Sequence, residues 1–187
     1  FGAVPGLTIA APMNEPELRN MMYTALGSGH PFMIRYPRGH GEGLPWRGEK
    51  FETLPVGRGR RLREGADVAL LTVGTVGNAA ARAAGRAAAE GVSVAHYDLR
   101  FVKPLDEALL DEVGRKFRRV VTVEDGSLRG GVGEAVAAFF NGRGYDVRVQ
   151  RLGIGDEWVE HGTPGQLYAL CGYDEEGILR ALLDTRA

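Results

Sequence analysis

The sequence has a single cysteine, Cys171, which excludes an internal disulfide and favours a reducing compartment. It has no run of 18 apolar residues, so we expect nothing that spans a membrane. Its opening residues lack the charged and apolar segments of a signal peptide. The formal net charge is -1 and no basic stripe carries interleaved aromatic residues, which argues against a nucleic-acid partner. These absences predict a globular, cytoplasmic protein.

Motifs of several enzyme classes are also missing. No cysteine or second histidine lies at ligand spacing from His161, which argues against a metal site. No histidine pairs with a serine in a recognisable nucleophile motif, so hydrolase chemistry has no support. The Gly130–Gly133 turn has neither a phosphate-loop Lys-Ser/Thr nor dinucleotide-fingerprint spacing. Glu124 and Asp125 precede it and would repel an anion, so we expect these glycines to serve a close domain contact.

The length of 187 residues, with 44% hydrophobic and 25% charged residues, is typical of one globular domain or of one domain plus part of another. The chain opens at Phe1 in the middle of a pattern, and we expect further residues upstream.

Residues 1–40 form a predicted strand-helix-strand unit. A strand over 7–10 is followed by a helix that Asn14 begins, with Glu17 as its reciprocal capping partner, and by a strand over 32–35. One apolar helix face is expected at Leu18, Met21, Met22, Ala25 and Leu26. So small a unit cannot cover both faces of its sheet, so we interpret it as the C-terminal end of a larger domain. Residues 41–54 show no periodicity and are predicted to be a linker.

Residues 55–187 alternate between strand and helix patterns, which predicts an α/β fold with a mainly parallel sheet and helices on both faces. The helix over 76–90 has a face of alanines that permits a close approach to the sheet. The expected strands cover 68–73, 92–97, 120–123 and 147–152, and the expected helices 76–90, 106–117, 132–141 and 175–183.

Two arginines, Arg35 and Arg38, follow the strand over 32–35 in the loop R-Y-P-R-G. In open α/β sheets, ligands bind beyond the carboxyl ends of strands. Two guanidinium groups there can hold a phosphate or a carboxylate through forked hydrogen bonds. Surface or interface ion pairs are the alternative, and the residue types alone favour that alternative.

Two further segments read mainly as structural. In residues 98–106, Asp98 and Arg100 are expected to bond to each other or to a neighbouring domain, and Asp106 to cap the next helix. Thr163 with Gln166 fits a capping box for a short helix.

Beyond these patterns, several segments occur in a familiar order. They are P-M-N-E-P-E-L-R-N-M-M-Y-T-A-L (12–26), R-Y-P-R-G (35–39), L-P-V-G-R-G (54–59), D-L-R-F-V-K-P-L-D (98–106), V-T-V-E-D-G (121–126), G-G-V-G (130–133) and H-G-T (161–163). Along nearly its whole length the chain resembles the C-terminal portion of 1-deoxy-D-xylulose-5-phosphate synthases, which are transketolase-like thiamine-diphosphate enzymes. Asn14 stands where that family often has Asp, and Asp125 where it often has Glu.

The resemblance implies that 1–40 ends the pyrimidine-binding second domain and that 55–187 form the transketolase C-terminal-like third domain. Such enzymes are homodimers that bind thiamine diphosphate through Mg²⁺ in their N-terminal domains. This chain contains neither the metal motif nor the activating glutamate, so we expect the fragment to bind no cofactor or metal by itself, to contribute no catalytic residue and to be inactive alone.

The resemblance also implies a reaction. Pyruvate condenses with D-glyceraldehyde 3-phosphate to give 1-deoxy-D-xylulose 5-phosphate and CO₂, feeding non-mevalonate isoprenoid, thiamine and pyridoxal biosynthesis. Arg38 would hold the acceptor phosphate. Arg35 is a second candidate for the same role, ranked below Arg38 because its side chain can face the sheet.

Two alternatives stay open. A beta subunit of a 2-oxoacid dehydrogenase would require a separate alpha chain and a lipoyl-bearing partner, and would have no use for a phosphate-binding arginine. A non-catalytic dimerisation module would only assemble or dock.

Overall fold

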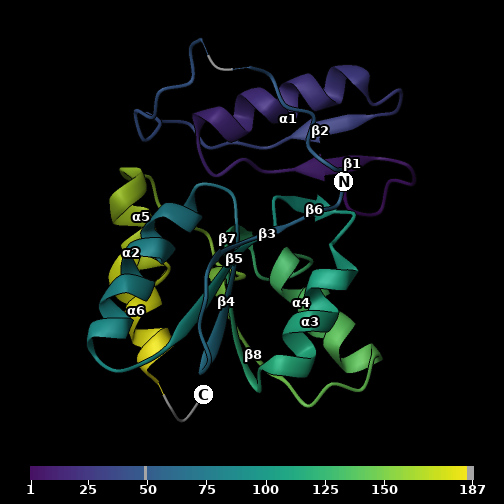
Figure 1. The fold of residues 1–187 in the computed structure, drawn as a ribbon. Helices are drawn as coiled ribbons and strands as arrows, with labels where there is room; N and C mark the ends of the chain where they lie inside the picture. Colours follow the sequence, from purple (N-terminus) through teal and green to yellow (C-terminus); the bar gives the residue numbers. More distant parts are fainter. Residues whose placement is uncertain (49, 185–187) are drawn as a thin grey trace.

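The structure is a computed structural model that describes residues 1–48 and 50–184. A five-stranded sheet of order β3-β5-β4-β7-β8 has helices on both faces, and a three-stranded sheet of order β2-β1-β6 lies beyond one end of it, beside α1 (Figure 1). The strands are β1 (Thr8–Ala10), β2 (Phe32–Ile34), β3 (Arg60–Arg63), β4 (Val68–Val73), β5 (Val94–Asp98), β6 (Phe101–Lys103), β7 (Arg119–Ser127) and β8 (Arg148–Ile154). The helices are α1 (Glu15–Gly27), α2 (Val76–Ala89), α3 (Glu107–Lys116), α4 (Val132–Gly142), α5 (Pro164–Leu170) and α6 (Glu175–Leu183).

The large sheet is mainly parallel, which confirms the predicted fold class. Strands β5, β4, β7 and β8 run parallel, and β3 pairs antiparallel with β5 at the edge. All six residues of β4 are buried. Leu70 packs in the core with α2 and α6, whereas its neighbour Leu71 packs in the core with α3 and α4. This alternation follows from the two-residue period of a strand that is covered on both faces.

Helix α2 packs closely on the sheet through its alanines, as the sequence predicts. Ala80, Ala83, Ala84 and Ala87 are buried in the core shared with α6. Among the described residues, no helix combines the length and the apolar character needed to cross a bilayer.

The small sheet contains a strand that the sequence patterns did not predict. β1 pairs parallel with β2, as expected, but also antiparallel with β6, which comes from the 98–106 connection. The sequence analysis also missed β3, whose residues are mostly arginine. Both strands are short edge elements, and so lack the apolar period that identifies buried strands.

Helix α1 is covered on only part of its predicted apolar face. Met21 is fully buried against Phe101 and Leu54, but Leu26 is 89% exposed and Met22 is also exposed. The single buried face expected for this helix is therefore incomplete within the described residues.

The predicted linker, 41–54, lies along α1. Its described residues, 41–48 and 50–54, form no helix or strand. The backbone N–H of Leu54 donates to Thr24 Oγ1 at 2.8 Å, and the rings of Tyr23 and Phe51 stack with centroids 5.1 Å apart. The division into 1–40, 41–54 and 55–187 stays a prediction, since β6 joins the first unit to the third by strand pairing.

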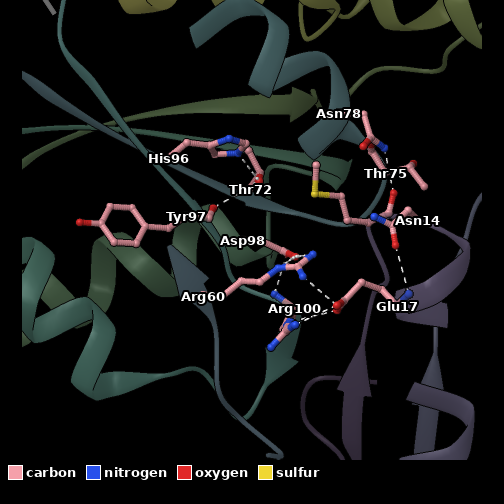
Figure 2. A network of polar contacts seen from close by, with 11 residues as sticks. Asn14, Glu17, Arg60, Thr72, Thr75, Asn78, His96, Tyr97, Asp98 and Arg100 are labelled. Carbon is pink, nitrogen blue, oxygen red and sulfur yellow. Dashed lines mark hydrogen bonds and ion pairs between the residues drawn. The ribbon is translucent and has the colours of Figure 1, made fainter. Parts of the chain in front are cut away.

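Glu17 does not act as the predicted reciprocal cap of α1. Asn14 Oδ1 does accept the backbone N–H of Glu17, at 3.1 Å. The Glu17 carboxylate instead accepts two hydrogen bonds from Arg100, at 2.8 and 2.9 Å, and pairs with Arg60 Nη1 at 2.9 Å (Figure 2). A buried carboxylate gains more from two guanidinium groups than from one backbone N–H.

Asp98 completes this network from β5. Arg60 bonds to its carboxylate at 3.1 and 3.2 Å, and the backbone N–H of Arg100 donates to Asp98 Oδ1 at 3.0 Å (Figure 2). Burial raises the pKa of Asp98, an effect that Arg60 opposes. Of the two expected alternatives, the bond between Asp98 and Arg100 is present through the Arg100 backbone, and the Arg100 guanidinium also reaches Glu17 of α1. The predicted helix cap also forms, since Asp106 Oδ1 accepts Leu109 N–H at 3.1 Å.

The buried His96 predicts how stability depends on pH. Its Nε2 lies 2.9 Å from Thr72 Oγ1, and burial, helped by Arg60 and Arg63, lowers the pKa of His96 from 6.5 to about 4. Between these pH values His96 binds a proton in the unfolded chain but stays neutral in the folded chain. The free energy of unfolding therefore has its full value above pH 6.5. It falls by roughly 3 kcal/mol in total as the pH drops towards 4.

Urea titrations between pH 4 and 7 measure the free energy of unfolding at each pH. In His96→Gln this free energy should fall less with decreasing pH than in the parent chain. His161→Gln is the control, because His161 is exposed and its replacement should leave the slope intact. Equal pH slopes for the parent chain and His96→Gln would contradict the assignment.

Candidate functional site

A large cleft lies where the carboxyl ends of the two sheets meet. It encloses about 700 Å³ between the loops that follow β1, β2 and β4, with α5 at one side. Its lining includes Asn14 and Glu15, Arg38 to Glu42, Thr75, Val76, Asn78, Ala79, Arg82 and Tyr168. Ligands of open α/β sheets bind beyond the carboxyl ends of strands, so this is the position expected for a site.

Direct bonds hold the walls of the cleft together. Asn78 Nδ2, in the first turn of α2, donates to Met13 O at 2.8 Å and to Thr75 O at 3.0 Å (Figure 2). Gly74 follows β4 and packs against Ala11, so a Cβ there would stand 3.5 Å from that side chain. The loops after β1 and β4 are thereby fixed to each other across the junction of the two sheets.

The structure places Arg38 and Arg35 in different recesses. Arg38 lines the large cleft and is exposed. Arg35 lines a much smaller cavity of about 50 Å³, together with Gly74 and Asp125. Within residues 1–48 and 50–184, neither guanidinium forms an ion pair with a carboxylate. Arg38 is therefore available to an anion in the larger cleft.

A carboxylate lines the small cavity, and α5 and the turn before α6 help to hold it. Asp125 accepts hydrogen bonds from Tyr173 Oη at 2.9 Å and from Tyr168 Oη at 3.2 Å. Burial raises the pKa of both tyrosines, and Asp125 raises them further, so both stay protonated as donors. Asp125 thereby tethers the C-terminal segment, and it lines the small cavity together with Arg35.

The glycine turn before α4 holds an internal anion. Glu124 is buried, and its carboxylate accepts the backbone N–H groups of Val132 at 2.9 Å and Gly133 at 2.8 Å. A Cβ at Gly131 would stand 2.6 Å from Glu124 Oε1. The glycine at 131 thus makes room for Glu124, and the expected contact of this turn with another domain stays a prediction. An acidic side chain at a helix N-terminus is favourable for the same reason as a bound anion.

The described residues do not fit a thiamine-diphosphate or metal site. Among them no cluster of three His, Cys, Asp or Glu side chains is placed to hold an ion. The backbone N–H groups of Val132 and Gly133 at the start of α4 are bonded to Glu124, so they are closed to a diphosphate.

The remaining candidates are structural or were missed. The capping box of α5 is confirmed, because Gln166 Oε1 accepts Thr163 N–H at 3.1 Å and Gln166 N–H donates back to Thr163 Oγ1. Sequence reasoning did not place Glu15, Asn78 or Tyr168 in a site. Each comes from a different loop or helix, and no local motif records that they share one cleft.

Comparison with known proteins identifies the fold family. The family described as Transketolase, C-terminal domain, matches residues 57–178. The chain belongs to this family. The transketolase C-terminal domain thus accounts for the five-stranded sheet and its covering helices, and the predicted resemblance is confirmed.

Individual relatives extend the likeness over nearly the whole chain. Proteins named 1-deoxy-D-xylulose-5-phosphate synthase from Bacteroides fragilis and Bacteroides thetaiotaomicron are 54% and 53% identical over 98% and 96% of this chain. The chain spans 28% of the length of each. It also matches a solved structure described as "Split gene transketolase, inactive beta4 tetramer" with a TM-score of 0.84 and 28% identity, over 97% of this chain and 58% of that one.

Thus the transketolase C-terminal domain, together with the strands β1 and β2 and the helix α1 before it, corresponds to a part of the longer relatives.

Proposed function

We propose that this chain is the C-terminal part of a 1-deoxy-D-xylulose-5-phosphate synthase. The proposal rests on the relatives of that name, which match 98% of the chain at up to 54% identity. The complete enzyme would condense pyruvate with D-glyceraldehyde 3-phosphate to give 1-deoxy-D-xylulose 5-phosphate and CO₂, the precursor step for isoprenoids, thiamine and pyridoxal.

The part of the reaction that we assign to this chain is binding of the acceptor phosphate by Arg38. One observation carries the assignment. Arg38 is exposed at a cleft of about 700 Å³, and the structure gives it no ion pair among the described residues. A guanidinium matches a phosphate through two parallel hydrogen bonds. Arg35 takes a lesser part, since it lies at the separate small cavity beside Asp125.

The remaining components belong to the rest of the same polypeptide. We assign thiamine diphosphate and Mg²⁺ to its N-terminal diphosphate- and pyrimidine-binding domains, and a homodimer as its working assembly in the cytoplasm. In this arrangement residues 1–40 complete the pyrimidine-binding domain, 41–54 link the domains, and 55–187 are the third. The exposed apolar side chains of α1, Met22 and Leu26 among them, are the kind of surface that another domain covers.

The direct test uses the full-length protein with thiamine diphosphate and Mg²⁺. Formation of 1-deoxy-D-xylulose 5-phosphate from pyruvate and D-glyceraldehyde 3-phosphate would support the proposal. Native mass spectrometry separates the main rival, because a beta subunit of a 2-oxoacid dehydrogenase would copurify with a different alpha chain. Absence of product together with such a partner would refute the proposal.

The 187-residue chain alone should bind thiamine diphosphate no more tightly than millimolar and show no synthase activity. The reason is that the α4 turn is filled by Glu124, and the described residues hold no metal cluster. Isothermal titration calorimetry with Mg²⁺ present checks this, with the full-length protein as the positive control. Micromolar binding to the chain alone would show that it carries a cofactor site.

A further inference from the structure

Glu15 lines the same cleft as Arg38 and bonds to the loop that carries Arg38. Its Oε1 accepts the backbone N–H of Gly43 at 2.7 Å. Both Glu15 and the loop residues from Arg38 to Glu42 line the cleft. The bond joins the first turn of α1 to a loop 28 residues further along the chain.

The loop is shaped to receive this carboxylate. A Cβ at Gly41 would stand 2.2 Å from Glu15 Oε1 and 2.5 Å from Cδ, closer than carbon and oxygen atoms approach. Only a glycine at this position leaves the carboxylate where it is. Hydrogen bonds from its own backbone N–H and from that of Gly43 also hold the pKa of Glu15 below its usual value. The carboxylate is therefore ionised at neutral pH, the form that accepts these bonds.

Beyond Glu15, the loop is held at its far end, where the Arg19 guanidinium donates to Trp46 O. Residues 35–46 contain no helix or strand, and every side chain from Arg38 to Trp46 is exposed. An exposed loop without regular structure is mobile unless specific bonds fix it, and mobility of Arg38 would lower its affinity for a phosphate by the entropy of ordering it.

We propose that Glu15 is a positioning residue that anchors the 38–44 loop and so sets the affinity of Arg38 for the phosphate of the acceptor. This inference rests on the proposed function for the role of Arg38. Glu15 does not touch the substrate. As an anion it would repel a phosphate if it pointed into the cleft, and its bond to Gly43 turns its charge towards the loop backbone.

The test uses the full-length protein and two independent measurements. In Glu15→Ala the amides of residues 41–44 should exchange with deuterium roughly five times faster on the sub-second scale, since one hydrogen bond to a charged group is lost. The KM for D-glyceraldehyde 3-phosphate should rise about three- to tenfold, with kcat and the KM for pyruvate within about twofold of the parent protein. Glu15→Gln should recover part of both effects, because its amide oxygen still accepts.

Two variants sharpen the result. Gly41→Ala leaves Glu15 in place but displaces its carboxylate, so it should reproduce Glu15→Ala in both measurements. Glu42→Gln removes a carboxylate from the same loop and should leave the exchange of 41–44 unchanged.

The outcomes separate the two proposals. If the exchange of the 41–44 amides is unchanged in Glu15→Ala, the anchoring role is overturned. If the KM for D-glyceraldehyde 3-phosphate is unchanged in Glu15→Ala while Arg38→Ala keeps its selective effect, only the positioning role is overturned. Equal KM increases for pyruvate and the acceptor would assign Glu15 to general stability instead. If Arg38→Ala itself shows no selectivity, the proposed function fails, and the exchange measurement still decides whether Glu15 anchors the loop.

Discussion

In the full-length protein, Arg38→Ala should lower kcat/KM for D-glyceraldehyde 3-phosphate by roughly tenfold to more than a hundredfold. A charge-assisted hydrogen bond contributes about 1.5–3 kcal/mol, which converts to that range of rate constants. Pyruvate carries no phosphate, so its binding should change little. Steady-state kinetics with each substrate varied in turn measure both effects.

Two comparisons test whether the phosphate is what Arg38 contacts. Arg38→Lys should recover only part of the loss, because an ammonium keeps the charge but lacks the planar fork. An unphosphorylated aldehyde acceptor should be almost insensitive to either substitution. Equal impairment of phosphorylated and unphosphorylated acceptors would make Arg38 a structural residue.

The same substitution at Arg35 should have a smaller effect on the acceptor. Arg35 lies at the small cavity beside Asp125, which already supplies a negative charge there. Arg35→Ala therefore serves as the matched arginine control, three positions before Arg38 in the chain.

Glu17→Ala should destabilise the 187-residue chain by about 3 kcal/mol, near the lower end of values for breaking a buried ion pair. The substitution strands Arg100, whose side chain is only 14% exposed, without its carboxylate. Arg60 loses one of two partners but keeps Asp98, which limits the loss. Urea denaturation at pH 7 measures the change as a lower midpoint with an unchanged slope.

The control is Glu64→Ala at an exposed ion pair with Arg61, 2.8 Å long. Exposed pairs contribute at most about 1 kcal/mol, so this variant should unfold close to the parent chain. Glu17→Gln should fall between the two, because the amide accepts hydrogen bonds but carries no charge. If Glu17→Ala and Glu64→Ala shifted the midpoint equally, the network would have no special part in joining α1 to the sheet.

The sequence predicted elements that have a strong internal period. The buried run Val68–Val73 and the terminal helix Glu175–Leu183 have the predicted bounds, because each shows its apolar pattern over enough residues to be unambiguous. The caps at Asn14, Asp106 and Thr163 were also predictable, since a cap depends on a side chain and a backbone group three residues apart.

The sequence did not predict the partner of a side chain that can bond either to a near neighbour in the chain or to a distant residue. Glu17 lies at the spacing of a capping partner, yet Arg100, 83 residues away, takes its carboxylate. The glycines at 130–133 suggested a contact with another domain, which stays a prediction, and the tertiary structure adds that Gly131 makes room for Glu124 of the same chain. At Glu17 a buried charge takes the partners with the larger electrostatic gain, and sequence spacing does not record which distant charges will be near.

The sequence by itself determined the α/β class, the central buried strand, the family and the position of Arg38 after a strand. These follow from short-range periods and contiguous motifs, which are read along the chain. Only the tertiary structure decided that β6 joins the first sheet, that Arg35 and Arg38 face different recesses, and that Glu15 meets the loop at Gly43. Those facts depend on how two sheets meet at their carboxyl ends, and long-range packing sets that geometry because it alone brings residues far apart in the chain within bonding distance.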